Sequence, residues 1–217
     1  MDFPYGETEL AHLRARDKTL GAAIDRIGPI HREVETDLFS SVIHHIIGQQ
    51  ISMAAQRTVW QRFQAAVGDG GPRTVSAMTE DRLQALGMSR RKASYILDFA
   101  RRTASGEFDV EALADMDDGA VLSALTALRG VGPWTAEMLM IFCLRRPDVV
   151  SFGDLAILRG MRMLYRRRSI DRAAFERYRK RYSPYGTTAS LYLWAVACGA
   201  LPELTDPAAP RSKGARP

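Results

Sequence analysis

Residues 128–140 read LRGVGPWTAEMLM, with two glycines in a four-residue turn, a proline and a tryptophan after it, and then an almost unbroken apolar run. The residues that lead into this turn, AVLSALTAL, place leucines three positions apart on one face of a helix. Pro133 suits the first position of a second helix, where a backbone N–H would have no partner within the helix. The stretch therefore predicts two helices joined by a tight glycine turn.

The glycine turn has a functional and a purely structural interpretation. Gly130 and Gly132 permit positive φ angles and present no Cβ to an approaching surface. Amides of such a turn, with those at the start of the second helix, can converge on an anion such as a phosphate. An ordinary turn between two helices, in which glycine saves space, explains the same spacing. The run AEMLMIFCL after the turn is apolar on nearly every side, which predicts a helix buried in the middle of the protein.

Composition limits the classes of protein to be considered. The chain has 217 residues, 46% of them hydrophobic, and a formal net charge of +5, so it can bury a normal core and favours an anionic partner. Cys143 and Cys198 are the only cysteines and lie in apolar runs, which excludes an iron–sulfur or zinc site built from four cysteines and predicts two buried thiols. The polar N-terminus and the lack of a long apolar run predict a cytoplasmic protein, nucleoid-associated if the source is prokaryotic.

The pattern along the chain is that of consecutive amphipathic helices with no period-two alternation, which predicts an all-α fold. Thr79, Ser89 and Asp171 precede three of these helices and are expected to cap them. The Pro-rich and basic residues 201–217 have no apolar period and are expected to form a mobile tail. The predicted helices span residues 7–16, 18–27, 36–48, 52–67, 80–86, 90–104, 118–128, 134–145, 155–166, 171–181 and 185–199.

Asp154 stands at the start of a predicted helix, in the stretch DVVSFGDLAILRGMRML (residues 148–164). An aspartate in this position is commonly an N-cap, and that interpretation is sufficient by itself. It is also compatible with catalysis, because the helix dipole and the free amides favour the ionised carboxylate. Such an anion could stabilise a developing cation.

Three stretches together resemble one protein family. LRGVGPWTAE is followed, twenty residues after its tryptophan, by Asp154, a pattern similar to that of the helix-hairpin-helix DNA glycosylases and most like their alkylation-repair branch, the 3-methyladenine DNA glycosylases. HHIIGQQISMAAQRTVWQRF (residues 44–63) is similar to the family's segment that plugs the duplex, and LGMSRRKASYILDFA (residues 86–100) matches its Gly-x-Ser-x-x-Lys helix start. The resemblance covers roughly residues 40–200.

The resemblance implies an architecture and a set of site residues. Two helical subdomains would flank a DNA-binding cleft, without an N-terminal β domain: residues 1–35 with 135–200, and residues 36–134 with the hairpin at their end. Asp154 would be the catalytic carboxylate. The base pocket would be lined by Trp134, Trp194 and Tyr185. The wedge that enters the duplex would be Gln50 with Ile51. The phosphate contacts would come from Gly130, Gly132, Thr135, Arg90 and Lys92. A monovalent cation, Na⁺ or K⁺, would be held in the DNA complex by the backbone carbonyls of Thr126, Leu128 and Val131.

The resemblance also implies an activity. Members that nick the DNA backbone carry a lysine where this chain has Trp134, so a monofunctional enzyme without lyase activity is expected. It would act as a monomer on double-stranded DNA, remove cationic purines such as 3-methyladenine and 7-methylguanine, and leave an abasic site. No cofactor is expected beyond the hairpin cation. Some relatives carry a tyrosine directly after the aspartate, where this chain has Leu155. The residue that forms this wall of the base pocket is therefore not assigned. Two alternatives remain: a non-catalytic DNA-binding module, and a glycosylase for oxidised or mismatched bases.

Overall fold

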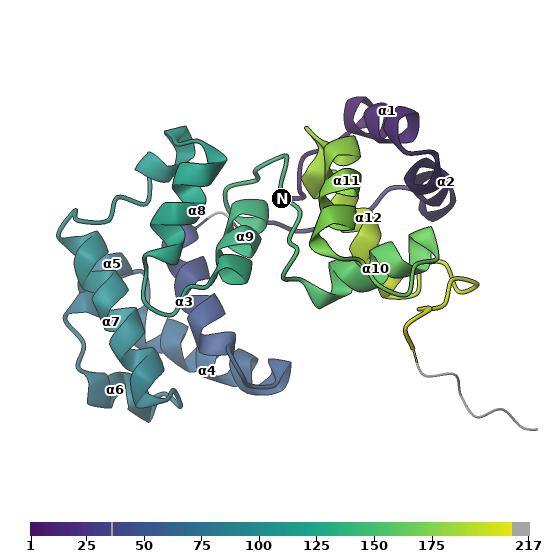
Figure 1. Cartoon of the computed structure of the whole chain (residues 1–217). Helices are drawn as coiled ribbons and strands as arrows, with labels where there is room; N and C mark the ends of the chain where they lie inside the picture. Colours follow the sequence, from purple (N-terminus) through teal and green to yellow (C-terminus); the bar gives the residue numbers. More distant parts are fainter. Residues whose placement is uncertain (36, 210–217) are drawn as a thin grey trace, which may run out of the picture. The chain divides into compact units, whose positions relative to one another are not determined.

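The computed structural model describes residues 1–35 and 37–209, and within these ranges the chain is helical (Figure 1). The described residues contain no β-structure beyond an isolated bridge between Asp2 and Glu33, so the all-α prediction is confirmed. No helix in this part of the chain is long and apolar enough to cross a membrane. The elements are α1 (Glu7–Arg16), α2 (Lys18–Ile27), α3 (Leu38–Gly48), α4 (Met53–Val67), α5 (Gly71–Ser76), α6 (Glu80–Ala85), α7 (Arg90–Ala104), the 3-10 helix η1 (Ala112–Asp115), α8 (Asp118–Thr126), α9 (Pro133–Phe142), α10 (Leu155–Tyr165), α11 (Arg172–Tyr182) and α12 (Gly186–Ala197).

The helices form two compact units. The middle unit is Val34–Leu144 and contains α3 to α9, whereas the terminal unit combines Met1–Glu33 with Arg145–Pro217 and contains α1, α2 and α10 to α12. The sequence-based division placed residues 135–144 with the terminal helices. The structure instead assigns α9 to the middle unit, because α9 packs against α8 and α3.

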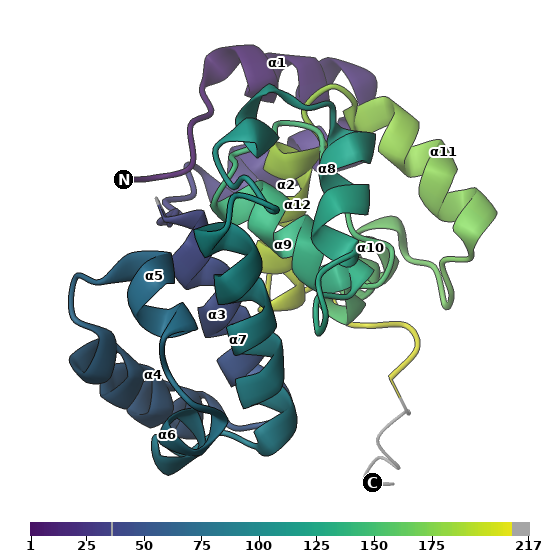
Figure 2. The ribbon, with the colours of Figure 1, turned by 90° about the vertical axis from the view of Figure 1, so that its left-hand side faces the viewer.

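The middle unit is built around α3, which packs against α4, α5, α7 and α9 (Figure 2). Phe39 of α3 stacks on Phe99 of α7, with ring centroids 5.2 Å apart, and both side chains are buried. Most residues of α9 are also buried, which confirms the prediction made from its apolar sequence. The glycine turn is thus attached to a helix that packing holds in place.

The terminal unit is organised around the contact between α10 and α12. A Cβ on Gly160 of α10 would overlap the backbone of Leu193, lying 2.9 Å from its carbonyl carbon, so glycine is what lets the two helices approach so closely. Beside them, Tyr165 donates to the Asp17 carboxylate at 3.0 Å and pairs with the Tyr182 hydroxyl at 2.7 Å. Desolvation by burial raises the pKa of both tyrosines, which keeps the phenols neutral.

Residues 201–206 are anchored to the terminal unit, contrary to the expectation of a mobile tail. Leu201 is buried, and Arg162 donates two hydrogen bonds to the Asp206 carboxylate, at 2.9 and 2.6 Å. Arg26 forms an ion pair with Glu203. Residues 210–217, the rest of the predicted tail, lie outside the described residues.

The cysteines differ from the sequence prediction. Cys143 is half-buried, and burial raises the pKa of its thiol to about 12. Cys198 is exposed at the end of α12, where the helix terminates, so its apolar neighbours did not predict its own position. Both thiols are free.

Candidate functional site

The predicted helix–turn–helix is present as α8, the turn and α9. Pro133 is the first residue of α9, and the carbonyl of Gly132 accepts the Ala136 amide at 2.9 Å as the helix begins. The first-turn amides of α9, such as that of Thr135, have no acceptor within the helix. The Thr135 side chain is buried, so only its backbone amide can serve the predicted phosphate contact.

The two glycines of the turn have different roles. Gly130 has a φ of +87°, and a Cβ there would press into the ring of Tyr95, 3.0 Å from Cε2 and closer still to Cδ2. The Arg129 guanidinium lies over the same ring, 5.2 Å from its centroid. Gly132 has a φ of −88°, open to any residue, and nothing lies within 4 Å of its missing Cβ. The prediction of positive φ therefore holds for Gly130 and is wrong for Gly132, whose lack of a side chain leaves an open surface.

The predicted wedge lies in a turn that is bonded to this hairpin. Gln50, between α3 and α4, is exposed and has a φ of +56°, a strained conformation for a residue with a side chain. Ile51 beside it is 40% exposed. The preceding Gln49 donates its side-chain amide to the Gly130 carbonyl at 2.7 Å. This hydrogen bond directly connects the turn that carries Gln50 to the glycine turn.

Lys92 also holds the turn that carries Gln50 and Ile51. Its ammonium donates to the carbonyls of Ile47 at 2.8 Å and Gln49 at 2.6 Å, at the C-terminal end of α3. Burial, aided by the nearby charge of Arg91, lowers the pKa of Lys92 from its usual value. Two of its three donors bond these carbonyls, so Lys92 fixes the turn that carries Gln50. The phosphate contact predicted for Lys92 would fall to the third donor and stays a prediction.

Replacing Lys92 with Met is expected to lower the free energy of unfolding by about 2 kcal/mol, because two charge-assisted hydrogen bonds are lost and two carbonyls at a helix end lose their donor. Urea unfolding measures this change. Arg91→Met is the matched control, since Arg91 is exposed in the same helical turn. If Lys92→Met left stability unchanged and only weakened DNA binding, Lys92 would be a phosphate ligand after all.

Asp154 caps α10, as the sequence predicted. Its carboxylate accepts the amides of Ala156 at 2.8 Å and Ile157 at 2.9 Å, and the residue is 7% exposed. The next residue, Leu155, is 81% exposed. The carboxylate is therefore held in place by two backbone amides at the N-terminal end of α10.

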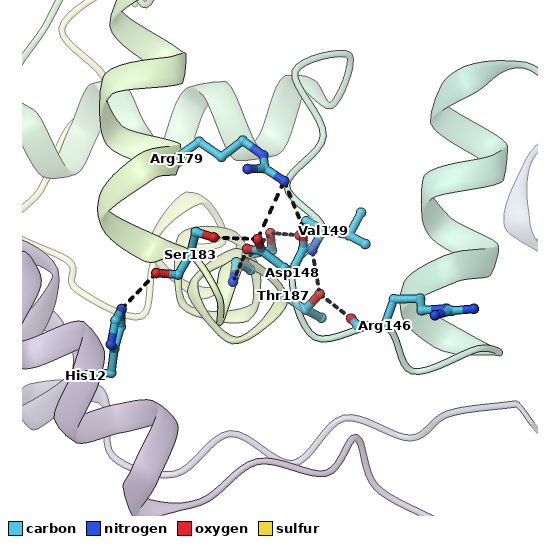
Figure 3. A network of polar contacts seen from close by, with 9 residues as sticks. His12, Arg146, Asp148, Val149, Arg179, Ser183 and Thr187 are labelled. Atoms are coloured by element: carbon cyan, nitrogen blue, oxygen red, sulfur yellow. Dashed lines mark hydrogen bonds and ion pairs between the residues drawn. The ribbon is translucent and has the colours of Figure 1, made fainter. Parts of the chain in front are cut away.

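A polar network that the sequence did not reveal fixes the segment leading to Asp154. Asp148 accepts the Ser183 hydroxyl at 2.6 Å and the Gly186 amide at 3.0 Å, and lies 3.7 Å from Arg179 (Figure 3). Thr187 accepts the Val149 amide at 3.0 Å. A Cβ at Gly186 would lie 2.6 Å from an Asp148 carboxylate oxygen. Residues 146–149 are thus hydrogen-bonded to the start of α12, and only the three-dimensional structure reveals this.

The predicted pocket aromatics divide between the two units. In the terminal unit, Tyr185 directly precedes α12 and packs edge-on against His12, with ring centroids 5.2 Å apart, while Trp194 of α12 is half-buried against the core. Asp154 belongs to the same unit. Trp134, the second residue of α9, belongs to the middle unit and is 45% exposed.

The remaining predicted ligands lie in the middle unit. Arg90 opens α7 with an exposed side chain and forms an ion pair with Glu80 at 3.2 Å. For the predicted cation site, the carbonyl of Leu128 accepts the Val131 amide at 3.1 Å, which leaves the oxygen a second lone pair. Thr126 ends α8. No group of three or more His, Cys, Asp or Glu side chains in the described ranges could hold a metal ion.

A glycine hairpin between α8 and α9, a strained glutamine turn bonded to it and an aspartate capping the next helix define a helix-hairpin-helix protein of the DNA glycosylase type. The chain belongs to the HhH-GPD superfamily of base excision DNA repair proteins, whose match covers residues 43–184. This confirms the family resemblance derived from the three sequence stretches.

Individual relatives extend the match to most of the chain. DNA-3-methyladenine glycosylase 1 of Schizosaccharomyces pombe is 28% identical over 210 residues, which are 94% of this chain and 91% of that protein. The crystal structure of a DNA-3-methyladenine glycosidase from Bacillus halodurans matches with a TM-score of 0.86 and 31% identity, over 94% of this chain and 95% of that one. The S. pombe glycosylase Mag1, in complex with abasic DNA, matches with a TM-score of 0.74 and 26% identity, over 87% of this chain and 95% of that one.

Proposed function

We propose that this protein is a monofunctional DNA glycosylase that removes alkylated, cationic purines from double-stranded DNA and leaves an abasic site. The observation that carries the proposal is the similarity to proteins named as 3-methyladenine glycosylases, in sequence and in structure, over more than nine-tenths of the chain. It would act as a monomer, in the compartment that holds the genome.

The proposed reaction begins with extrusion of the damaged nucleotide, because its glycosidic bond is out of reach inside the duplex. Extrusion costs a few kcal/mol, and least for a weakly paired base. The amides of the glycine turn and of the start of α9 bind the sugar–phosphate strand. Gln50 and Ile51, exposed on the strained turn, fill the space that the base vacates. The hydrogen bond between Gln49 and Gly130 fixes the position of the turn that carries Gln50 relative to the turn that binds the strand.

Bond cleavage then needs little acid catalysis, since a purine methylated at N3 or N7 is already cationic and leaves readily. An indole face such as that of the exposed Trp134 would stack on this cation, a contact worth about 0.5–2 kcal/mol depending on desolvation. Asp154 opposes the positive charge that develops on the sugar. Its two amide contacts hold the carboxylate in place before the reaction, so no reorganisation is needed at that moment.

One feature favours a hydrolase without lyase activity. Trp134 occupies the position where the lyase members carry lysine, and an indole offers no amine for a Schiff base. The carbonyls of Thr126, Leu128 and Val131 would hold a monovalent cation, which would supply positive charge facing a DNA phosphate. The second lone pair on the Leu128 carbonyl is consistent with such a ligand.

The proposal is tested by incubating the protein with methylated duplex DNA and measuring free purines by chromatography and abasic sites by heat-induced strand breaks. Release of 3-methyladenine or 7-methylguanine is expected, with no covalent adduct trapped by borohydride. Duplexes with 8-oxoguanine or a mismatch serve as comparison substrates. Binding without release would favour the non-catalytic module, release only from a comparison substrate would favour the alternative glycosylase, and a trapped adduct would show lyase chemistry.

A further inference from the structure

The positive charge of the chain is concentrated in one stretch of the terminal unit. Residues 166–181 contain eight Lys or Arg and two Asp or Glu, a formal net charge of +6, whereas the whole chain carries +5. The middle unit, residues 34–144, contains ten Lys or Arg and thirteen Asp or Glu, a net charge of −3. The unit that holds the glycine turn is therefore acidic overall, and long-range attraction to a polyanion must come from elsewhere.

Most of the basic side chains in this stretch are exposed and have no carboxylate partner. Arg172 pairs with Glu176 at 2.9 Å, Arg181 with Asp17 at 3.2 Å, and Arg179 lies 3.7 Å from Asp148. Five other basic residues, all exposed, form no ion pair with any described residue. We call these five the α11 basic surface: Arg166, Arg167, Arg168, Arg177 and Lys180.

Packing between aromatic rings brings the loop residues Arg166 to Arg168 close to the basic residues of α11. The ring of Tyr165, the last residue of α10, stacks on Tyr178 of α11 with centroids 3.9 Å apart and an interplanar angle of 17°. Arg166 follows the first tyrosine and Arg177 precedes the second, so the stack places the two basic segments side by side. Figure 2 shows the loop after α10 leading into the start of α11.

The backbone of the loop is also fixed. Arg166 ends α10 in the left-handed conformation, with a φ of +52°, and the Arg167 amide bonds back to the Arg162 carbonyl at 3.0 Å. Asp171 caps α11 by accepting the Ala174 amide at 2.7 Å, as the sequence predicted. Backbone hydrogen bonds therefore fix the conformation of the loop that carries these arginines.

Intramolecular energetics do not account for this clustering. A basic residue in the last turn of a helix gains about 0.3–1 kcal/mol from the helix dipole, which rationalises Lys180 but not Arg177 or Arg168. Like charges three or four residues apart on a helix are destabilising by about 0.2–0.5 kcal/mol. An external polyanion would remove this repulsion, and a regularly charged phosphate backbone is the natural one.

We propose that the α11 basic surface contacts phosphates of duplex DNA and adds sequence-independent affinity to that of the glycine turn. The proposal rests on the proposed function only in taking duplex DNA as the substrate. Each phosphate that a basic residue neutralises releases counterions. Each such contact makes the slope of log K against log salt concentration, called the salt slope below, steeper by about 0.9.

The test compares two triple variants of equal charge change. Arg167, Arg168 and Arg177 are replaced by Gln in one. Exposed Arg73, Arg82 and Arg101 of the middle unit are replaced by Gln in the control. Affinity for an undamaged 25-base-pair duplex is measured at several salt concentrations, with circular dichroism as the check on folding. The first variant is expected to lose about 2–3 units of salt slope and tenfold or more in affinity at 0.1 M salt, and the control less than one unit.

Several outcomes would overturn this inference. An unchanged salt slope in the first variant, or an equal loss in both, would show that the surface makes no specific contribution. If the first variant lost binding to a polyglutamate peptide but kept its DNA slope, the partner would be an acidic protein. Single-turnover purine release at saturating enzyme is measured in parallel. Absence of release in the unmodified protein would contradict the proposed function and leave the binding result interpretable.

Discussion

Asp154→Asn is expected to lower the single-turnover rate of methylpurine release by about 100-fold or more, while the fold and DNA binding are retained. Asparagine is as good an N-cap as aspartate, because its side-chain oxygen can still accept the amides that Asp154 accepts from Ala156 and Ile157. The substitution therefore keeps the helix start and removes only the negative charge. Loss of that charge removes the stabilisation of the positive sugar in the transition state.

The measurement separates the two roles of this carboxylate. Urea unfolding should show little change, and affinity for duplex DNA should stay the same or rise, since one anion has been removed. The control is Asp117→Asn, the same change at the N-cap of α8, where the carboxylate accepts the Ala120 amide at 2.8 Å. Nearly normal release by Asp154→Asn would show that Asp154 is only a cap, and the proposed mechanism would be wrong.

The sequence predicted those features whose cause is local. Caps such as Thr79, Ser89 and Asp154 lie within three residues of the amides that they accept, and their first turns follow the expected pattern. The burial of α9 was predicted correctly, because a helix that is apolar on nearly every side must be buried. By contrast, no helix was predicted over α5, which begins with Gly71 and Pro72, although proline is tolerated in the first turn of a helix.

Features that depend on distant partners could not be predicted in this way. The roles of Lys92 and Asp148 depend on carbonyls and hydroxyls more than thirty residues away. The anchoring of the segment after α12 depends on the contact between Asp206 and Arg162. A residue's type indicates which bonds it can form, but not which of many possible partners will lie beside it. The residues of the candidate site were accordingly named from a resemblance, and their surroundings came from the structure.

Gly130→Ala is expected to destabilise the protein by about 2–5 kcal/mol and to abolish productive DNA binding. A residue with a Cβ pays about 1–2 kcal/mol for the left-handed conformation that Gly130 adopts. Overlap with the Tyr95 ring adds about 1–3 kcal/mol, because Arg129 lies over this ring and limits its movement. The turn must then shift, and the Gly130 carbonyl leaves the Gln49 amide that ties it to the wedge.

Gly132→Ala is the matched comparison and should behave in the opposite way. Its φ of −88° and the empty space around its missing Cβ predict an unchanged midpoint temperature, whereas Gly130→Ala should lower that temperature by about 4–20 °C. A Cβ on this open surface would nevertheless meet a DNA backbone that approaches the turn closely, so affinity for duplex DNA should fall about tenfold. A stable Gly132→Ala protein with undiminished affinity would mean that the strand does not approach Gly132. If both variants had the same midpoint temperature, the backbone conformation at position 130 would not require glycine.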